Sequence, residues 1–137
     1  MADHPLVRLE TLALIAIGGF AGANLRYFAL GAFTEIQAVL LANVLGCFLL
    51  GFLVYEAEYT GYVGSRSRTV FTTGFLSSLT TYSTFAVQSS LAADPFLFVA
   101  IVAGNYGLGF AAVIASRELA RQFRDSGDVS TTEGETA

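Results

Sequence analysis

The sequence predicts an all-α membrane protein with four transmembrane helices. Of its 137 residues, 54% are hydrophobic and 13% are charged, whereas soluble domains carry about 25% charged residues. The apolar residues form four long stretches that are separated by short polar connections. A helix needs about 20 apolar residues to cross the hydrocarbon layer of a bilayer, and each of these stretches reaches that length.

The four predicted spans cover residues 9–32, 36–55, 69–92 and 95–116. The first apolar stretch is too long for the central region of a signal peptide, so we expect it to be retained as a helix. The first connection contains Gly31, and the second contains Gly61, Gly64 and four charged residues. The third connection is the short turn before Pro95, a residue that fits the first turn of the following helix.

A change of composition marks the end of the membrane domain. Residues 1–124 are expected to form one four-helix transmembrane domain. The remaining sequence, DSGDVSTTEGETA, has a single apolar side chain larger than alanine and contains four acids. Such a segment buries too little apolar surface to fold, so we expect residues 125–137 to be a disordered acidic tail.

The arginines indicate how the chain is oriented in a cell membrane. With four spans, both termini and the second connection lie on one side, and that side carries Arg8, Arg66, Arg68, Arg117, Arg121 and Arg124. The opposite side has only Arg26, and the chain contains no lysine. Because basic residues are retained in the cytoplasm, we expect a multi-pass protein of the cell membrane with both termini cytoplasmic.

Several functions are excluded by what the spans lack. No aspartate or glutamate lies near the middle of a span, although a proton-coupled exporter needs an ionisable group on its pathway. The sequence shows no Ser-His-Asp set, phosphate-binding loop or metal-ligand spacing, so we expect that the chain is not an enzyme. The single cysteine, Cys47, is interpreted as a small packing residue.

Two polar features inside the spans suggest a site. Asn43 is a lone amide in the middle of the second span; it serves either as an interhelical hydrogen-bonding group or as a donor to a ligand. The segment GFLSSLTTYSTF (residues 74–85) carries seven hydroxyl groups in twelve residues. Hydroxyl groups can satisfy the backbone where a membrane helix is broken, so this segment favours a broken third helix.

An aromatic pair belongs to the same segment. Tyr82 and Phe85 are three residues apart and therefore share a helix face. Ring edges carry positive partial charge, so these edges together with hydroxyl groups suit a small anion. The alternative is a polar helix interface with ordinary aromatic packing.

Three motifs resemble those of the fluoride channel family (Fluc, also called CrcB). They are GGFAGANLRY at residues 18–27, NVLGCFLLG at 43–51 and the segment at 74–85. The resemblance implies an antiparallel, dual-topology dimer whose broken third helices cross at the centre. It also implies passive export of cytoplasmic fluoride and a structural sodium ion bound by backbone carbonyls.

The resemblance also implies roles for individual residues. Sodium would be held by the carbonyls of Ser77 and Thr80. The fluoride pathway would be formed by the Asn43 amide, the ring edges of Tyr82 and Phe85, and the hydroxyls of Ser83 and Thr84. Arg26 would lie in a vestibule or brace the fold. The sequence departs from the family pattern at Ser77 and Ser78, where the family has two glycines, and at Tyr82, where it has phenylalanine.

The partners that follow are fluoride, sodium, membrane lipid and a second subunit, which is either a second copy or a paralogue. A homodimer of opposed chains requires little arginine asymmetry, yet this chain has six arginines on one side and one on the other. The bias suggests a heterodimer with a paralogue of reversed bias. The alternative function is that of a non-conducting membrane subunit in such a pair.

Overall fold

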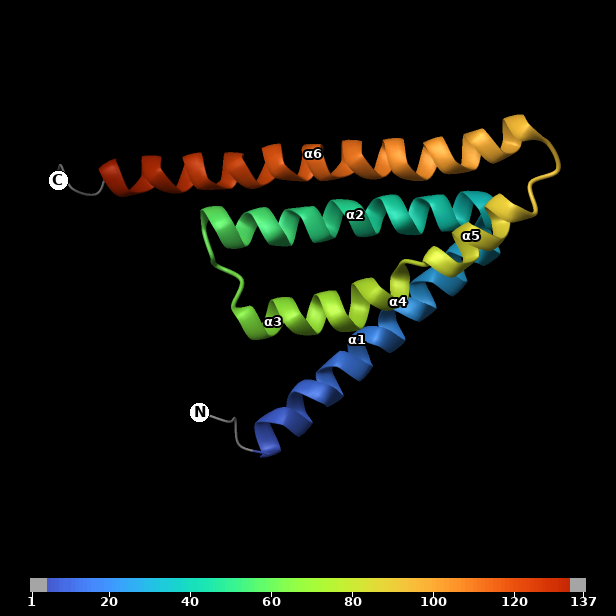
Figure 1. The fold of residues 1–137 in the computed structure, drawn as a ribbon. Helices are drawn as coiled ribbons and strands as arrows, with labels where there is room; N and C mark the ends of the chain where they lie inside the picture. The colour runs from blue at the N-terminus through green and yellow to red at the C-terminus, as the bar shows by residue number, and fades with distance from the viewer. Residues whose placement is uncertain (1–4, 134–137) are drawn as a thin grey trace.

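The computed structural model describes residues 5–133, and side chains are described as far as Arg124. All the secondary structure of this part is helical (Figure 1). The elements in order are α1 (Pro5–Ala32), α2 (Glu35–Tyr59), α3 (Ser65–Val70), the π-helix η1 (Phe71–Leu76), α4 (Ser77–Leu79), α5 (Tyr82–Ser90) and α6 (Pro95–Glu133).

Three helices are long and apolar enough to cross a membrane, namely Pro5–Ala32, Glu35–Tyr59 and the Pro95–Arg124 part of α6. They correspond to the first, second and fourth predicted spans. The predicted third span, residues 69–92, is divided among α3, η1, α4 and α5. The expected break is confirmed, because the backbone leaves the helical conformation at Thr80 and Thr81. None of the pieces has the length of a spanning helix.

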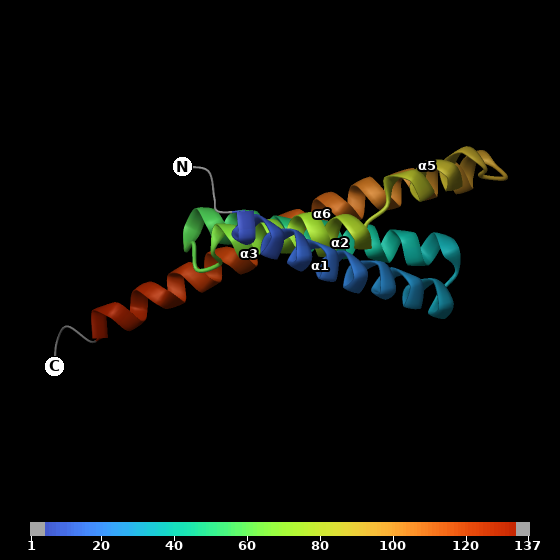
Figure 2. The same cartoon turned by 90° about the horizontal axis from the view of Figure 1, so that it is seen from below.

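The helix α2 lies along α6, and α1 crosses the α3–η1–α4 segment (Figures 1 and 2). The crossing of α1 over this segment depends on Gly22 of the GGFAGANLRY motif, since a Cβ atom there would collide with the backbone carbonyl of Phe75. Gly46 has the same function on α2, where a Cβ atom would collide with the Thr80 side chain. These two glycines therefore allow both neighbouring helices to approach the segment that contains the break.

The first residues of α1, the connection between α2 and α3, and the C-terminal half of α6 gather at one end of the molecule (Figure 1). An ion pair between Arg66 and Glu10, at 2.8 Å, joins two of these regions. Because the start of α1 and the C-terminal half of α6 lie at the same end, the arrangement agrees with an even number of membrane crossings. That this end faces the cytoplasm remains a prediction.

The connection between α2 and α3 is organised by Glu56, which is only 7% exposed. Its carboxylate accepts hydrogen bonds from the Val63 amide at 2.9 Å and the Thr60 hydroxyl at 3.2 Å. It also pairs with Arg68 at 3.5 Å, and Arg68 donates to the Val63 carbonyl at 2.8 Å. Gly61 turns the chain with a φ of 65°, a conformation that glycine adopts at low cost.

The last element, α6, has a helical backbone to Glu133, and its side chains are described as far as Arg124. The division into a membrane domain to residue 124 and a disordered acidic tail from residue 125 stays a prediction. Residues 134–137 lie outside the described part.

Candidate functional site

The break between α4 and α5 is held by one side chain from another helix. Thr80 and Thr81 adopt extended conformations, with φ and ψ of −79° and 157° and of −150° and 116°. The Asn43 amide on α2 bonds both polar groups of the Thr81 backbone: its Oδ1 accepts from the Thr81 nitrogen at 2.9 Å, and its Nδ2 donates to the Thr81 carbonyl at 3.2 Å. Asn43 thus replaces hydrogen bonds that a continuous helix would have made.

The break relieves several carbonyls of their usual helical donors. In a continuous helix the Thr81 amide would donate to the Ser77 carbonyl and the Thr84 amide to the Thr80 carbonyl. Here the Thr81 amide donates to Asn43, and the Thr84 amide donates to the Thr81 hydroxyl at 3.3 Å. The carbonyls predicted to bind sodium are therefore among those that lose a helical donor at the break.

Arg26 reaches this region from α1. Its Nη1 donates to the Thr80 carbonyl at 3.3 Å, and its side chain is half-buried. Of the two placements that the sequence left open, this geometry corresponds to a brace across the break. A carbonyl oxygen has two lone pairs, so the bond to Arg26 leaves Thr80 one acceptor position.

The Asn43 amide has no spare donor in this arrangement. Its Nδ2 also donates to Asn105 Oδ1 at 3.1 Å, so both of its hydrogens are engaged. Asn105, on α6, in turn donates to the Ile101 carbonyl at 3.0 Å. Donation from Asn43 to an anion would therefore have to replace one of these bonds, and that role stays a prediction.

Three hydroxyl groups cluster where α5 begins. The Thr81 hydroxyl lies 3.3 Å from that of Ser83 and 3.0 Å from that of Thr84. Thr81 is buried, Thr84 is half-buried and Ser83 is exposed. Other hydroxyls of the segment, including those of Ser77 and Thr80, bond to helix carbonyls one turn earlier. The cluster therefore supplies hydroxyls at the break itself, while the others stabilise the helix before it.

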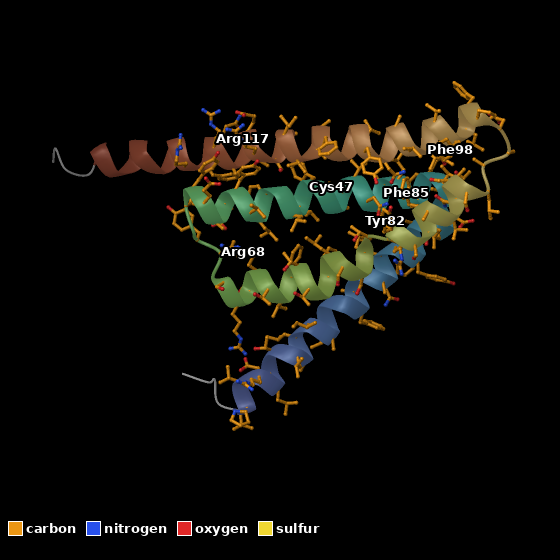
Figure 3. All side chains as sticks on the ribbon, viewed as in Figure 1. Cys47, Arg68, Tyr82, Phe85, Phe98 and Arg117 are labelled. Atoms are coloured by element: carbon orange, nitrogen blue, oxygen red, sulfur yellow. The ribbon has the colours of Figure 1, made fainter. Side chains whose placement is uncertain are left out.

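The predicted aromatic pair is formed, and it has a third member. The ring centroids of Tyr82 and Phe85 are 5.6 Å apart, and both residues lie beside the break (Figure 3). Tyr106 on α6 meets Phe85 edge to face, at 5.9 Å and 86°. Phe85 is 7% exposed and Tyr82 is 73% exposed, so the cluster extends from the interior to the surface.

An open groove of about 570 Å³ runs past the break. Its lining comes from α2, the broken segment and α6, and carries no charged residue. The lining residues are Asn43, Gly46, Cys47, Leu50, Thr72, Thr73, Leu76, Ser77, Thr80, Thr81, Tyr82, Phe85, Asn105 and Tyr106. Such a surface offers hydroxyl, amide and ring hydrogens in an otherwise apolar environment. It suits a small ion that must be neither excluded nor trapped.

Sequence reasoning missed several of these residues. The partners Thr81, Asn105 and Tyr106 were not selected as site residues. Gln88 was also missed: both polar atoms of its amide are buried and without a hydrogen-bond partner in the described part of the chain. Gln88 lies four residues after Thr84 and hence on the same face of α5, a spacing that was available in the sequence.

The residues present fit a monovalent cation better than a transition metal. No group of three His, Cys, Asp or Glu side chains is placed to hold a metal within the described residues. The Ser77 and Thr80 carbonyls are hard oxygen ligands released by the break, which is the chemistry that a sodium ion requires. That these two carbonyls bind sodium stays a prediction.

Comparison with known proteins gives a consistent result. The family model described as CrcB-like protein, Camphor Resistance (CrcB), matches residues 13–117. The chain is 52% identical over 128 residues to "Fluoride-specific ion channel FluC 1" of Haloarcula marismortui, covering 93% of this chain and 99% of the relative. It is 47% identical over 114 residues to a protein of the same name from Natronomonas pharaonis, covering 82% and 95%.

A third relative, "Fluoride-specific ion channel FluC 2" of Halobacterium salinarum, is 46% identical over 116 residues, covering 84% of this chain and 90% of the relative. No solved structure matches.

Proposed function

This chain belongs to the CrcB family of membrane proteins, and from that premise we propose that it is a fluoride-specific ion channel. The relatives are named as ion channels, so the expectation that the chain is not an enzyme is confirmed. Its long apolar helices agree with a multi-pass membrane protein. The single observation that carries the proposal for this chain is the uncharged polar groove beside the helix break.

The groove provides what a small anion needs to leave water. Moving a small ion into a low-dielectric medium costs on the order of 20 kcal/mol by an idealised estimate, while one hydrogen bond to a charged group contributes about 1.5–3 kcal/mol. Several donors must therefore act together. The donors that we assign to the pathway within the groove are the ring edges of Tyr82 and Phe85. The Ser83 and Thr84 hydroxyls and the Gln88 amide, which lie on α5 outside the groove lining, are assigned as its continuation.

The absence of charge in the lining is part of the proposal. A fixed cation within a few ångströms would interact with fluoride by about 4 kcal/mol at an effective dielectric constant of 20, which slows release from the site. Neutral donors lower the cost of entry and still allow the ion to leave. Passive diffusion of fluoride out of the cell follows from such a lining, because nothing in it couples fluoride to a second ion.

The complete channel is proposed to be an antiparallel dimer in which the broken segment completes a fourth crossing. The groove is open and Tyr82 is largely exposed in the single chain, so a second subunit is needed to close the pathway against lipid. A structural sodium ion would be held by the Ser77 and Thr80 carbonyls as a brace between the two breaks. At about 10 Å from fluoride it would contribute only about 1.7 kcal/mol at an effective dielectric constant of 20, so it would not trap the anion.

The arginine bias favours a second candidate, in which this chain is one subunit of a heterodimer. Six of its seven arginines lie towards one end, which opposes insertion in both orientations. Methanosarcina acetivorans contains relatives named both FluC 1 and FluC 2, so paralogous pairs occur among these proteins. A non-conducting role in such a pair is the alternative to a conducting homodimer.

Fluoride efflux from liposomes tests the proposed function. The purified chain is expected to release trapped fluoride and to retain chloride under the same gradient. Asn43→Asp is expected to stop the efflux, because a carboxylate beside the groove repels the anion and cannot donate to Thr81 or Asn105. If liposomes with the wild-type chain retain fluoride, alone and with a coexpressed paralogue, the proposal is wrong.

Accessibility of tagged termini tests the heterodimer. A single orientation with both termini in the cytoplasm supports pairing with a paralogue. Equal populations of the two orientations exclude that pairing and support a homodimer.

A further inference from the structure

A cluster of tyrosine and arginine side chains lies far from the groove, where α2 ends against α6. Tyr55 and Tyr59 are stacked, with ring centroids 5.9 Å apart. The Arg117 guanidinium lies over Tyr55, 5.8 Å from the ring centroid, and its Nε donates to the Tyr59 hydroxyl at 3.5 Å. The Arg124 guanidinium lies over Tyr59 at 5.2 Å. We name these four residues the arginine–tyrosine cluster.

Arg117 differs from its neighbours in having no carboxylate partner. Arg66 pairs with Glu10 at 2.8 Å, Arg68 with Glu56 at 3.5 Å and Arg121 with Glu118 at 3.3 Å. Among the side chains that the structure describes, none forms an ion pair with Arg117 or accepts a hydrogen bond from its two terminal nitrogens. The two tyrosines therefore orient a cation that forms no ion pair with a described carboxylate.

The surface next to Arg117 is apolar on the membrane side. Ile114 and Phe110 precede Arg117 by three and seven residues, so they lie on the same face of α6. They are 63% and 69% exposed. The cluster itself lies at the end of the molecule that carries most of the arginines (Figure 3). Tyrosine is enriched at the membrane–water interface, and arginine binds phosphate with a planar set of donors.

We propose that the arginine–tyrosine cluster binds the phosphate headgroup of an anionic phospholipid, with an acyl chain along Ile114 and Phe110. A lipid is the ligand that presents a phosphate directly above an apolar chain, and this is the order in which α6 presents Arg117, Ile114 and Phe110. An acidic protein segment would match the charge and leave the apolar face uncovered. The site is independent of the proposed channel activity.

Lipid retention by the purified full-length protein tests the site. The protein in mild detergent is exchanged into mixtures of phosphatidylglycerol and phosphatidylcholine, and the bound lipid is counted by native mass spectrometry. Phosphatidylglycerol is expected to be retained preferentially. Arg117→Gln is expected to weaken its binding about fivefold, and Arg117→Gln with Arg124→Gln about 30-fold, which corresponds to the usual contribution of each arginine near an anionic lipid.

The matched control is Arg66→Gln, which removes an equal charge at the same end of the molecule from an existing ion pair. It is expected to leave retention unchanged. Tyr55→Leu keeps every charge and removes the ring under Arg117, so a loss of retention in this variant distinguishes an organised site from general charge attraction. Arg117→Lys is expected to give an intermediate loss, because lysine lacks the planar donor geometry.

Four results would overturn the proposal. One is equal retention of the two lipids, and another is an effect of Arg66→Gln as large as that of Arg117→Gln. The third is displacement of the lipid by an excess of inorganic phosphate, which would identify a free phosphate ion as the ligand. A stable complex with a coexpressed acidic protein that excludes lipid would equally contradict it. Monodisperse elution of every variant in size-exclusion chromatography shows that the comparison is between folded proteins.

Discussion

In two regions of this molecule the backbone leaves the helical conformation, and its polar groups find hydrogen-bond partners in different ways. At the break between α4 and α5, the exposed backbone of Thr81 is bonded on both sides by the neutral amide of Asn43. At the connection between α2 and α3, the backbone is bonded by the carboxylate of Glu56, whose charge is balanced by Arg68. The Thr81 backbone is thus bonded by a neutral amide, with Arg26 bonding only the neighbouring Thr80 carbonyl, whereas the connection uses a buried ion pair.

The difference follows the position of each interruption along the molecule. The ion pair lies at the end that carries most of the arginines, which we expect to face water and lipid headgroups. The neutral network lies between the long helices, beside a groove whose lining has no charge. A carboxylate at the break would repel an anion, and an unbalanced cation would retain it. Neutral hydrogen bonding would therefore let one segment be both a structural break and part of the proposed anion pathway.

The largest effect is expected when the neutral network is removed. Asn43→Ala leaves the Thr81 amide and carbonyl without partners, and each unsatisfied buried group costs about 1–3 kcal/mol. We expect the break to rearrange, fluoride efflux to fall by about tenfold or more, and the thermal unfolding temperature to drop. Liposome efflux and circular dichroism melting in detergent measure the two effects.

Asn24→Ala is the matched control for that change. Asn24 is a half-buried amide on α1 whose side chain bonds only the Phe20 carbonyl one turn earlier. It is expected to leave efflux and melting close to those of the wild type. Equal effects of the two variants would show that Asn43 has no special relation to the break.

The charged region is expected to affect stability without affecting conduction. Glu56→Gln leaves Arg68 without its counter-charge, and breaking a buried ion pair costs roughly 3 kcal/mol. The melting temperature should fall, while fluoride efflux per folded protein stays the same. Glu58→Gln, an exposed residue two positions later, is the control and should change neither. A loss of efflux in Glu56→Gln at full stability would remove the distinction between the two regions.

A smaller effect is expected from the brace between α1 and the break. Arg26→Gln weakens the long hydrogen bond to the Thr80 carbonyl, and a bond of this kind contributes about 1.5–3 kcal/mol when the donor is charged. We expect a modest fall in melting temperature, with Arg26→Lys intermediate between this variant and the wild type. If both variants melt like the wild type and conduct less, Arg26 serves the ion path and not the break.

The sequence was sufficient for those features that depend on local pattern. Hydropathy located α1, α2 and the membrane part of α6, and the density of hydroxyl groups located a break that the structure places at Thr80 and Thr81. The hydrogen bonds of Asn43 to Thr81 were not predictable, because they join residues 38 positions apart and depend on how α2 meets the broken segment. The packing of Tyr106 on Phe85 escaped prediction for the same reason.

The smallest effect on fluoride efflux is expected at Tyr82, the exposed member of the aromatic cluster. Its variants distinguish a contribution of the ring edge from one of the hydroxyl group. Within the described part of the chain, the Tyr82 hydroxyl makes no hydrogen bond, while its ring lies 5.6 Å from Phe85. If the ring edge is the group that contacts fluoride, Tyr82→Phe keeps that contact and should change efflux by less than about twofold, whereas Tyr82→Leu removes the edge and should reduce efflux further. Comparison of the two variants in the same liposomes measures the contribution of the ring. An equal loss in Tyr82→Phe and Tyr82→Leu would assign the contribution of Tyr82 to its hydroxyl and would exclude a contribution from the ring edge.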